Sequence, residues 1–348
     1  MKLISSLLLF FGSILSFAQN IPAYYQGIDF SQGGSHLEQQ LTNLMSMTHT
    51  VQLSYTPQTW DAIMTTDENP NDPTEVLLVY GYNDSSSNPV SHRTRAKNLN
   101  CTGGNCNGLW NREHVYPRSL GGFEEQSWPG SDVHALRSAD SNMNEIRVNR
   151  PFAIGNGNNA HITPNGSFFP GQEWKGDVAR MIMYMHIRYP QQCQASDVAY
   201  SNYTYNSQMP DIFLRWNAED PPSQFEIRRN NILQSIYQGN RNPFIDNPYL
   251  ATLIWGGPEA QNSWNNLQIA EPEADARSIK LAPNPAIDYV YYAPNNYTSI
   301  TVWNIAGQLV SEDMDLTDNK TLLPEKPGLY FIKFCYDGQC VSSKAIKK

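Results

Sequence analysis

The sequence lacks several features that define other classes of protein. Beyond its first residues it has no apolar run as long as a transmembrane helix requires. Its five cysteines form no C-x-x-C pair and no grouping with histidine at zinc-site spacing. An H-E-x-x-H motif is also missing. We therefore expect neither a membrane-spanning protein, nor a zinc finger, nor a zinc protease of the H-E-x-x-H type.

Positive charge is scarce as well. The chain has 24 Lys and Arg against 33 Asp and Glu, which gives a formal net charge of -9. Such a chain is a poor electrostatic match to a polyphosphate. A nucleic-acid site in this protein would therefore depend on a few local arginines and a metal ion.

The first 18 residues have the pattern of a secretory signal peptide. Lys2 precedes an apolar run from Leu7 to Leu15, and Ser16-Phe17-Ala18 provides a small-x-small cleavage site. We therefore expect residues 1–18 to be a signal peptide and the mature protein to be exported.

Export permits disulfides. Cys101 and Cys106 bracket the turn-forming residues T-G-G-N, and Cys335 and Cys340 bracket Y-D-G-Q, which contains a hairpin signal. Each pair could close a short loop. Cys193 would then be a buried free thiol.

The 348 residues exceed the length of one typical domain. We predict an α+β fold with a mainly helical catalytic domain over 19–256, a polar linker over 257–278 and a small β-sandwich over 279–348. The periodicity of apolar residues predicts the elements of the first domain. These are helices at His36–Met45, Thr59–Thr65, Asp132–Phe152, Trp174–Pro190 and Phe225–Tyr237, and strands at Glu75–Tyr82 and Leu109–Tyr116.

The stretch Trp110–Pro117, W-N-R-E-H-V-Y-P, carries the strongest chemical signal. It places the carboxylate of Glu113 beside the imidazole of His114. Adjacent residues of a strand point to opposite faces, so the two can serve one site only at a bend or a cleft edge. A carboxylate that holds a hard metal and an imidazole that takes a proton from water are the groups that phosphodiester hydrolysis needs.

The segment Asp132–Phe152, D-V-H-A-L-R-S-A-D-S-N-M-N-E-I-R-V-N-R-P-F, makes this signal more specific. With the preceding motif it resembles the bacterial endonuclease I family of ββα-metal (His-Me finger) nucleases, over roughly Leu41–Trp255. The resemblance implies that a bent hairpin and a following helix form the site. It further implies an exported, sequence-nonspecific endonuclease that cuts DNA, RNA or both.

The resemblance also assigns roles to residues. Glu113 and Asn144 fall on the family's metal ligands, and His114 falls on its general base. So sparse an oxygen ligand set suits Mg²⁺, with Ca²⁺ or Mn²⁺ as possible substitutes. The products would carry 5′-phosphate and 3′-hydroxyl ends.

A family arginine holds the phosphate, and Arg118 is the best positional match in this chain. Several other arginines are candidates for contacts with nucleic acid, although nearby acids favour surface ion pairs for any one of them. These are Arg112, Arg137, Arg147, Arg180 and Arg241.

Two alternatives remain at this stage. Asp132 and His134, as D-x-H, could join Glu113 and His114 in a zinc hydrolase site, because carboxylate and imidazole both bind zinc. The chain could also be an inactive surface module whose β-domain binds a glycan.

The residues after 278 show a second resemblance. A P-N-P opening, an N-x-x-G-Q centre, a G-L-Y-F segment and a closing K-A-I-K-K occur in order between Ile279 and Lys348. This region resembles the C-terminal sorting domain of the type IX secretion system. The resemblance implies that the secretion machinery is a partner and that the protein is secreted or held at the cell surface. We expect a monomer.

Overall fold

The computed structural model describes residues 21–264, 279–293, 297–313, 318–336 and 339–348. The chain divides into two compact units, Met1–Ile269 and Ala270–Lys348. The predicted signal peptide and most of the predicted linker lie outside the described residues. Each unit is considered by itself.

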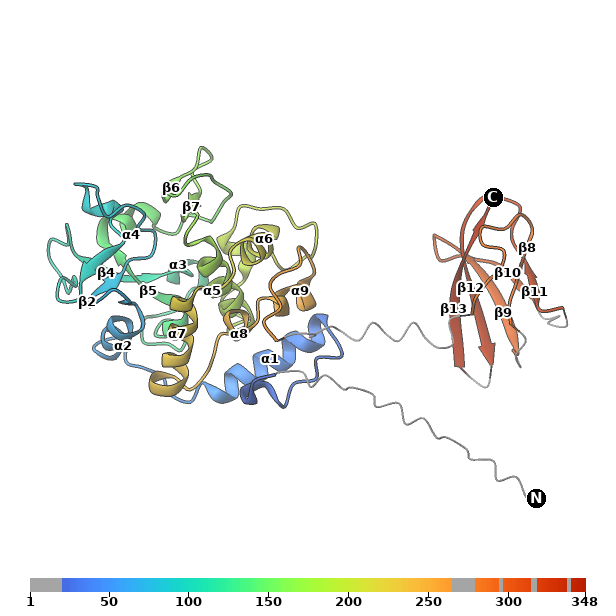
Figure 1. The fold of residues 1–348 in the computed structure, drawn as a ribbon, viewed down its shortest axis with the longest axis horizontal. Coiled ribbons are helices and arrows are strands. Elements are labelled where there is room, and N and C mark those ends of the chain that lie inside the picture. Colours follow the sequence, from blue (N-terminus) through green and yellow to red (C-terminus); the bar gives the residue numbers. More distant parts are fainter. Residues whose placement is uncertain (1–20, 265–278, 294–296, 314–317, 337–338) are drawn as a thin grey trace, which may run out of the picture. The chain divides into compact units, whose positions relative to one another are not determined.

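Helices dominate the first unit (Figure 1). The predicted helices at His36–Met45, Thr59–Thr65 and Trp174–Pro190 are confirmed, each with slightly different ends. The predicted helix Phe225–Tyr237 is a helix that ends in a π-helical turn, Leu233–Tyr237. The α-helices are α1 (Gly34–Thr48), α2 (Gln58–Thr66), α3 (Arg118–Gly121), α4 (Ser141–Arg147), α5 (Lys175–Arg188), α6 (Asp211–Glu219), α7 (Gln224–Ile232), α8 (Pro243–Asp246) and α9 (Tyr249–Trp255).

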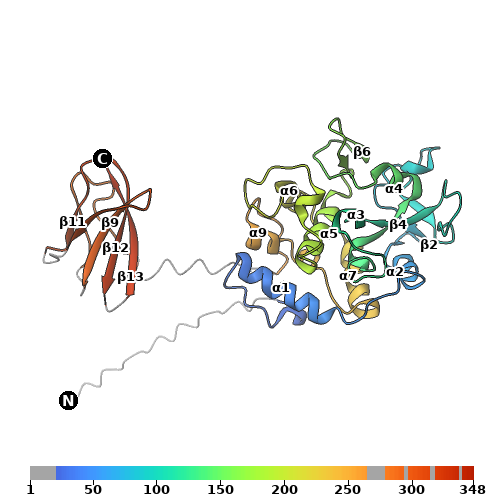
Figure 2. The ribbon, with the colours of Figure 1, turned by 180° about the vertical axis from the view of Figure 1, so that it is seen from behind.

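Helix α5 lies in the middle of this unit, and Figures 1 and 2 show it there from both sides. It contacts α1, α6 and α8. Every residue from Lys175 to Ile187 is buried, polar residues included. A helix that is surrounded on all sides cannot keep charged side chains in water, so its charged residues must find partners inside the protein.

The strands of the first unit are short. They are β1 (Glu68–Asn69), β2 (Asp72–Leu77), β3 (Thr94–Ala96), β4 (Trp110–His114), β5 (Leu136–Asp140), β6 (His161–Ile162) and β7 (Phe168–Phe169). Strands β1, β2 and β3 form one antiparallel sheet, and β4 pairs with β5 in another. Strand β2 ends at Leu77, so only the first three residues of the predicted strand Glu75–Tyr82 belong to a strand.

The prediction of one helix over Asp132–Phe152 was wrong. Residues 133–135 form a 3₁₀ turn, Leu136–Asp140 is strand β5, and only Ser141–Arg147 is helical. All five residues of β5 are buried, so no face of the strand is exposed to solvent. Its sequence therefore lacks the alternation of polar and apolar residues that marks a half-buried strand. Asp140 then starts α4 because its carboxylate accepts hydrogen bonds from the backbone N–H of Asn142 and Met143.

The second unit contains a four-stranded antiparallel sheet in the order β10-β9-β12-β13 and a two-stranded sheet of β11 and β8. The two sheets share one core, to which Val290, Ile300, Ile332 and Phe334 contribute. The description as a β-sandwich stays a prediction. The strands are β8 (Tyr289–Tyr291), β9 (Ser299–Asn304), β10 (Leu309–Asp313), β11 (Lys320–Leu322), β12 (Gly328–Tyr336) and β13 (Gln339–Lys347).

Both predicted disulfides are present, Cys101–Cys106 in the first unit and Cys335–Cys340 in the second. Cys193 is a buried free thiol, as predicted. Within the described part of the chain, no helix combines the length and the apolar character that crossing a membrane would require.

Candidate active site

The candidate site is built on the β4–β5 hairpin and on α4, which follows it directly. Glu113 of β4 lies opposite Arg137 of β5. Helix α4 contacts both strands. Trp110 and Leu136 belong to one buried cluster, and Ala139 and Met143 belong to another. The hairpin and the start of the helix are therefore held between two hydrophobic cores.

Glu113 is almost fully buried, with 2% of its surface exposed. Its Oε1 accepts a hydrogen bond of 3.0 Å from the Tyr80 hydroxyl and lies 3.5 Å from Nη1 of Arg147. Burial raises the pKa of this carboxyl group to about 7, although Arg147 and Tyr80 favour the charged form. The site thus holds an acid whose charge is only partly compensated by the protein.

The two partners of Glu113 are themselves joined through aromatic rings. Tyr80 packs edge-on against Phe168 at 5.0 Å between ring centroids, and Phe168 lies 6.4 Å from Phe152. The guanidinium of Arg147 lies 4.7 Å from the centre of the Phe152 ring. Glu113, Tyr80, Phe168, Phe152 and Arg147 thus form a closed circuit, that is, a ring of successive contacts among buried groups. This circuit fixes the position of the Glu113 carboxylate.

Backbone strain occurs at the same place. Tyr80 has a φ of 73° and Val148 a φ of 52°, values that are unusual for residues with large or β-branched side chains. Tyr80 binds Glu113, and the carbonyl of Val148 accepts a hydrogen bond from Arg147. Strain of this kind tends to gather at functional sites.

His114 reaches the site from the neighbouring position. Its Nε2 lies 2.8 Å from the carbonyl oxygen of Gly130, and its ring stacks on Tyr55 at 5.6 Å. A carbonyl can only accept, so Nε2 carries the proton and Nδ1 keeps its lone pair. Burial lowers the pKa of His114 to about 3, so the ring is neutral near pH 7.

The close packing of the backbone at position 130 requires a glycine. A Cβ at this position would collide with the carbonyl oxygen of Glu124. Only glycine can therefore pass this point and present its own carbonyl to the histidine.

Asn144 of α4 completes the group. Its Nδ2 donates a 2.8 Å hydrogen bond to Oδ1 of Asn111. Asn111 and Glu113 are two apart on β4, so their side chains lie on the same face of the hairpin. The nitrogen of the Asn144 amide is engaged, which leaves its oxygen as the atom that could bind a cation.

A cavity of about 380 Å³ opens at this site. Its walls include Glu113, His114 and Asn144, so the three residues chosen from the sequence are brought together. Tyr55, Arg112 and Arg118 also face this cavity.

The arginines at the cavity are held in different ways. Arg118 is partly exposed and forms a 3.2 Å ion pair with Glu125. Arg112 stacks between Tyr55 and Trp60, with its Cζ 3.5 and 4.2 Å from the two ring centres. Arg147 is fully buried behind Glu113 and donates to the carbonyl of Val115.

The three other candidate arginines are buried or bound to other side chains. Arg137 and Arg180 are fully buried, and nucleic acid cannot reach them as it could reach a surface residue. Arg241 uses its guanidinium nitrogens on Asp246, Gln234 and Asn231. We therefore do not retain these three as phosphate-binding candidates.

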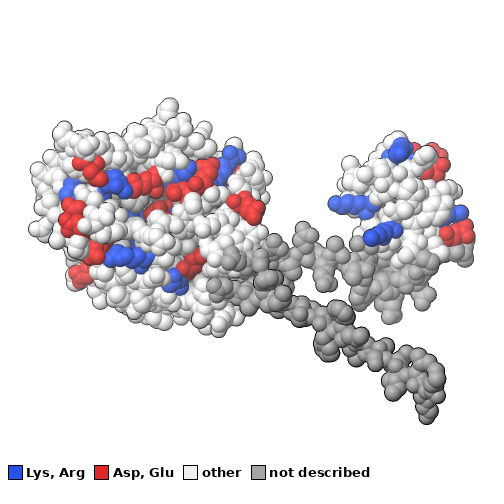
Figure 3. Space-filling model, viewed as in Figure 1, with Lys and Arg blue, Asp and Glu red and all other residues white. Residues whose placement is uncertain are grey.

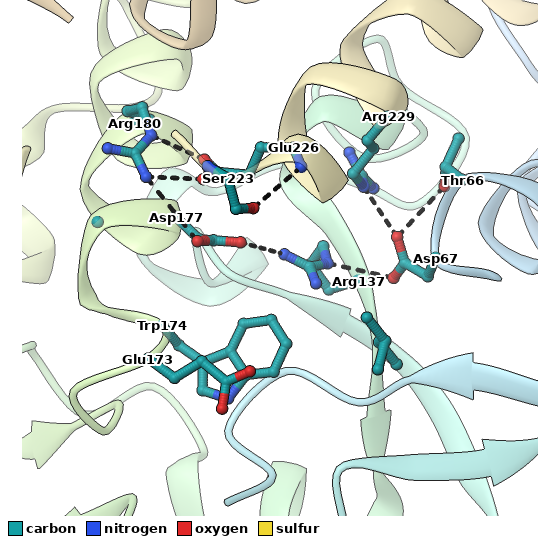
Figure 4. Close-up of polar contacts among 12 residues, drawn as sticks. Thr66, Asp67, Arg137, Glu173, Trp174, Asp177, Arg180, Ser223, Glu226 and Arg229 are labelled. Carbon is teal, nitrogen blue, oxygen red and sulfur yellow. Dashed lines mark hydrogen bonds and ion pairs between the residues drawn. The ribbon is translucent and has the colours of Figure 1, made fainter. Parts of the chain in front are cut away.

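Figure 4 shows what Arg137 and Arg180 do instead. Arg137 bridges Asp67 and Asp177 at 3.2 and 3.1 Å, and Arg180 pairs with Glu226 at 2.7 Å. Asp67 also accepts from the backbone N–H and the hydroxyl of Ser138 in β5. This buried network ties the hairpin to helices α5 and α7.

The alternative zinc site is not assembled. The carboxylate of Asp132 accepts hydrogen bonds from Tyr184, Tyr189 and Gln238, and Nε2 of His134 lies 3.3 Å from the carbonyl of Asn240. Both residues are buried. Across the residues that the structure describes, no three side chains of His, Cys, Asp or Glu gather as a metal-binding group.

Buried His134 should make stability depend on pH. Burial lowers its pKa to about 3, against the attraction of Asp132. Between the unfolded value of about 6.5 and pH 3, the unfolded chain therefore binds one more proton than the folded chain. The free energy of unfolding should fall by about 1.4 kcal/mol per pH unit for this group as the pH drops below 6.5.

Urea unfolding between pH 7 and pH 4 checks this expectation. The free energy of unfolding of the variant H134Q should fall less steeply with decreasing pH than that of wild type. The control variant H36Q, which changes an exposed histidine, should show the same slope as wild type. Equal slopes in wild type and H134Q would contradict the assignment.

The sequence did not reveal Tyr80, Tyr55 or Gly130. Tyr80 and Tyr55 come from segments far from the motif and look like ordinary aromatic core residues. The only available signals were the Y-G-Y turn at 80–82, after the apolar run 76–79, and the Pro-Gly pair at 129–130.

Comparisons with known proteins show the family to which the chain belongs. Residues 33–249 match the family model described as endonuclease I, and residues 280–348 match the model of a secretion system C-terminal sorting domain. The first match covers more than half of the chain. An extracellular ribonuclease of Bacillus subtilis (strain 168) is 38% identical over 261 residues, covering 70% of this chain and 84% of the relative. An extracellular ribonuclease of Bacillus amyloliquefaciens is 36% identical over 254 residues, covering 70% and 81%.

The first unit is therefore a nuclease. The chain belongs to the endonuclease I family and carries a C-terminal secretion sorting domain, which makes it a secreted or cell-surface protein.

Proposed function

We propose that the protein is a metal-dependent, sequence-nonspecific endonuclease of the ββα-metal type that cuts RNA, DNA or both. The observation that carries the proposal is the meeting of Glu113, His114 and Asn144 in one cavity, at the junction of a hairpin and a helix. The two relatives named as ribonucleases support RNA as a substrate.

The residues fit a divalent cation. Glu113 and Asn144 offer one carboxylate and one amide oxygen, the hard ligands that Mg²⁺ prefers, with room in the cavity for its waters. A buried carboxylate whose pKa is raised to about 7 would gain from a cation beside it. Ca²⁺ and Mn²⁺ accept the same ligands. When bound, such an ion supplies positive charge opposite the phosphate oxygens.

His114 acts as the general base. Its Nδ1 takes a proton from a water molecule, whose oxygen forms a bond to phosphorus while the bond to the 3′ oxygen breaks. The Gly130 carbonyl holds the tautomer that this step requires. The products carry 5′-phosphate and 3′-hydroxyl ends, and the leaving oxygen takes its proton from solvent.

Arg118 and Arg112 are the groups that could hold the substrate phosphate. Arg118 sits at the cavity wall, and its exposed pair with Glu125 is weak enough to exchange for a phosphate. Arg112 is held against two rings, and its Nη1 donates hydrogen bonds to the Tyr55 carbonyl and the Thr59 hydroxyl, which leaves Nη2 to meet a phosphate oxygen. Arg147 is better placed to orient Glu113 than to touch the substrate.

Removal of metal is the direct test of the proposed function. Purified protein should nick supercoiled plasmid and degrade single-stranded RNA with Mg²⁺, and both activities should disappear in excess EDTA and return when Mg²⁺ is restored. Full activity in EDTA, or recovery with Zn²⁺ but not with Mg²⁺, would contradict the proposed metal site.

Tyr80 offers a sharper test of the circuit around Glu113. The variant Y80F keeps the ring against Phe168 and removes only the hydroxyl that binds the carboxylate. We expect the Mg²⁺ concentration for half-maximal activity to rise about tenfold, because partners of metal ligands typically contribute that much. Activity at saturating Mg²⁺ should recover largely. Thermal unfolding separates this effect from a general loss of structure.

The sorting domain supports the type IX secretion machinery as a partner. Nucleic acid is the proposed substrate, and the monomeric state stays a prediction.

A further inference from the structure

A second cavity, of about 540 Å³, lies next to the catalytic one. Its walls include Gln52, Trp128, Arg188, Tyr189 and Gln192. The catalytic mechanism uses none of these residues. Their chemistry, an indole and a guanidinium among amide side chains, is that of sites which bind nucleobases and phosphates.

The two cavities share the segment 124–130 as a common wall. Glu125 faces the catalytic cavity, whereas Gln126 and Trp128 face the second one. The same segment ends in Gly130, whose carbonyl binds His114. A strand that leaves the catalytic cavity over this wall therefore enters the second cavity.

The wall is internally braced. The backbone N–H of Ser127 donates to the carbonyl of Glu124 at 3.1 Å, and the N–H of Ser131 donates to the carbonyl of Ser127 at 3.0 Å. Gln52 donates a 2.6 Å hydrogen bond to the carbonyl of Gln126. A surface held in this way can offer Trp128 in a fixed position.

Trp128 is 39% exposed. The ring of His49 packs edge-on against it, with 4.9 Å between centroids and 87° between the planes. The indole is thus supported from one side by a buried residue. A partly exposed, supported aromatic ring is a platform on which a base can stack.

Arg188 has no acidic partner in the part of the chain that the structure describes. Most described arginines of the first unit form an ion pair, but no described carboxylate lies within ion-pair distance of Arg188, and the same holds for Arg112, Arg150 and Arg215. Its guanidinium lies over Tyr189 at 4.5 Å, and its Nε is buried without a hydrogen-bond partner among the described residues. A partly desolvated cation without a counter-charge is suited to bind an anion.

The placement of the unpaired arginines matters in so acidic a protein. Figure 3 shows acidic and basic side chains interspersed on the face of the first unit that it presents, with no broad basic surface. Arg112 faces the catalytic cavity and Arg188 faces the second cavity, on either side of the shared wall. Each cavity therefore has one arginine without an acidic partner among the described residues, available to bind one phosphate of a strand that spans both cavities.

We propose that the second cavity is a nucleotide subsite for a single-stranded segment of the substrate next to the cleaved bond. Trp128 stacks on the base, and Arg188 binds the adjoining phosphate. A base in a duplex is already stacked on its neighbours, so the subsite favours single-stranded RNA or DNA over duplex. This inference rests on the proposed nuclease function and adds a preference that the catalytic residues do not explain.

The test uses the full-length mature protein and the variants W128A, W128F and R188Q. Two substrates are compared, a single-stranded oligonucleotide of about a dozen nucleotides and bis(p-nitrophenyl) phosphate, which is too small to reach the subsite. The ratio of the two kcat/KM values should fall about tenfold in W128A and in R188Q, mainly through a higher KM for the oligonucleotide. W128F keeps a stacking ring and should recover most of the ratio.

The chain offers matched controls. Arg215 also has no acidic partner among the described residues and lies over a tyrosine, Tyr205, but it faces a different cavity. Tyr200 is an exposed aromatic residue of that same cavity. The variants R215Q and Y200A should leave the ratio as in wild type.

An unchanged ratio in W128A and R188Q would overturn the inference. So would an equal loss on both substrates, since Trp128 would then act only through the wall that holds His114. Binding of a fluorescein-labelled oligonucleotide in EDTA is measured in parallel and does not depend on catalysis. If wild type cleaves neither substrate, the proposed function fails, and the binding measurement still decides the subsite: weaker binding by W128A than by Y200A supports it, and equal binding overturns it.

Discussion

The variant H114A is expected to lose about a thousandfold in kcat for RNA and DNA while it keeps its fold. General-base catalysis typically contributes a factor of this order. The side chain packs on Tyr55 and Phe123 and makes one hydrogen bond, to the carbonyl of Gly130, so we expect its removal to leave the fold largely intact. Nicking of supercoiled plasmid at saturating Mg²⁺ measures the loss, and circular dichroism follows the fold.

Imidazole added to the H114A protein provides a second readout. The truncated side chain leaves space beside Gly130 in a cavity that is open to solvent. A small base that occupies this space should restore part of the activity, and more so at a pH where imidazole is neutral. The variant H161A removes a histidine that does not line the cavity and should behave as wild type. A rate of cleavage by H114A close to that of wild type would show that another group takes the proton from the attacking water.

The motif and its partners were predictable because their chemistry is local. W-N-R-E-H-V-Y-P shows an acid, a base and a strand pattern within eight residues. Asn144 lies on α4, the helix that follows the second strand of the hairpin. The structure brings Glu113, His114 and Asn144 to one cavity. Asn144 was assigned through the resemblance to the endonuclease I family, and it lies close to the motif because α4 directly follows the β4–β5 hairpin.

The roles of the arginines could not be predicted in the same way. Arg137 looks like a surface residue of a helix, yet it belongs to a buried strand and bridges Asp67 and Asp177, which are distant in sequence. The helix pattern over Asp132–Phe152 was misleading because β5 is buried on both faces and its polar residues find partners inside the protein. Periodicity reports burial on one side, and it fails where polar residues are buried in pairs.

Tyr80 illustrates a third limit. Its hydroxyl reaches Glu113 only because the turn after β2 takes a left-handed conformation at a non-glycine residue. No residue preference in the sequence signals such a conformation, since tyrosine seldom adopts it. The contacts that fix the Glu113 carboxylate are therefore a property of the folded chain.

The variant E113Q should have opposite effects on the stability of the protein and on its binding of a metal ion. The amide keeps the size of the carboxylate and can still accept the hydrogen bond from Tyr80. It removes a negative charge that the buried site disfavours, as the raised pKa of about 7 indicates. We therefore expect the thermal midpoint to stay the same or to rise.

Function should change in the opposite direction. An amide oxygen is a much weaker ligand than a carboxylate for a hard cation, so the affinity for Mn²⁺ in a calorimetric titration should fall about a hundredfold, and cleavage in millimolar Mg²⁺ should be close to background. The matched control is E145Q, which removes an exposed carboxylate beside Asn144 on α4 and should retain wild-type affinity. An E113Q protein that is less stable yet binds Mn²⁺ as wild type does would mean that Glu113 serves the fold through Arg147. A protein that is at least as stable but does not bind the ion would mean that this buried charge is kept for the metal.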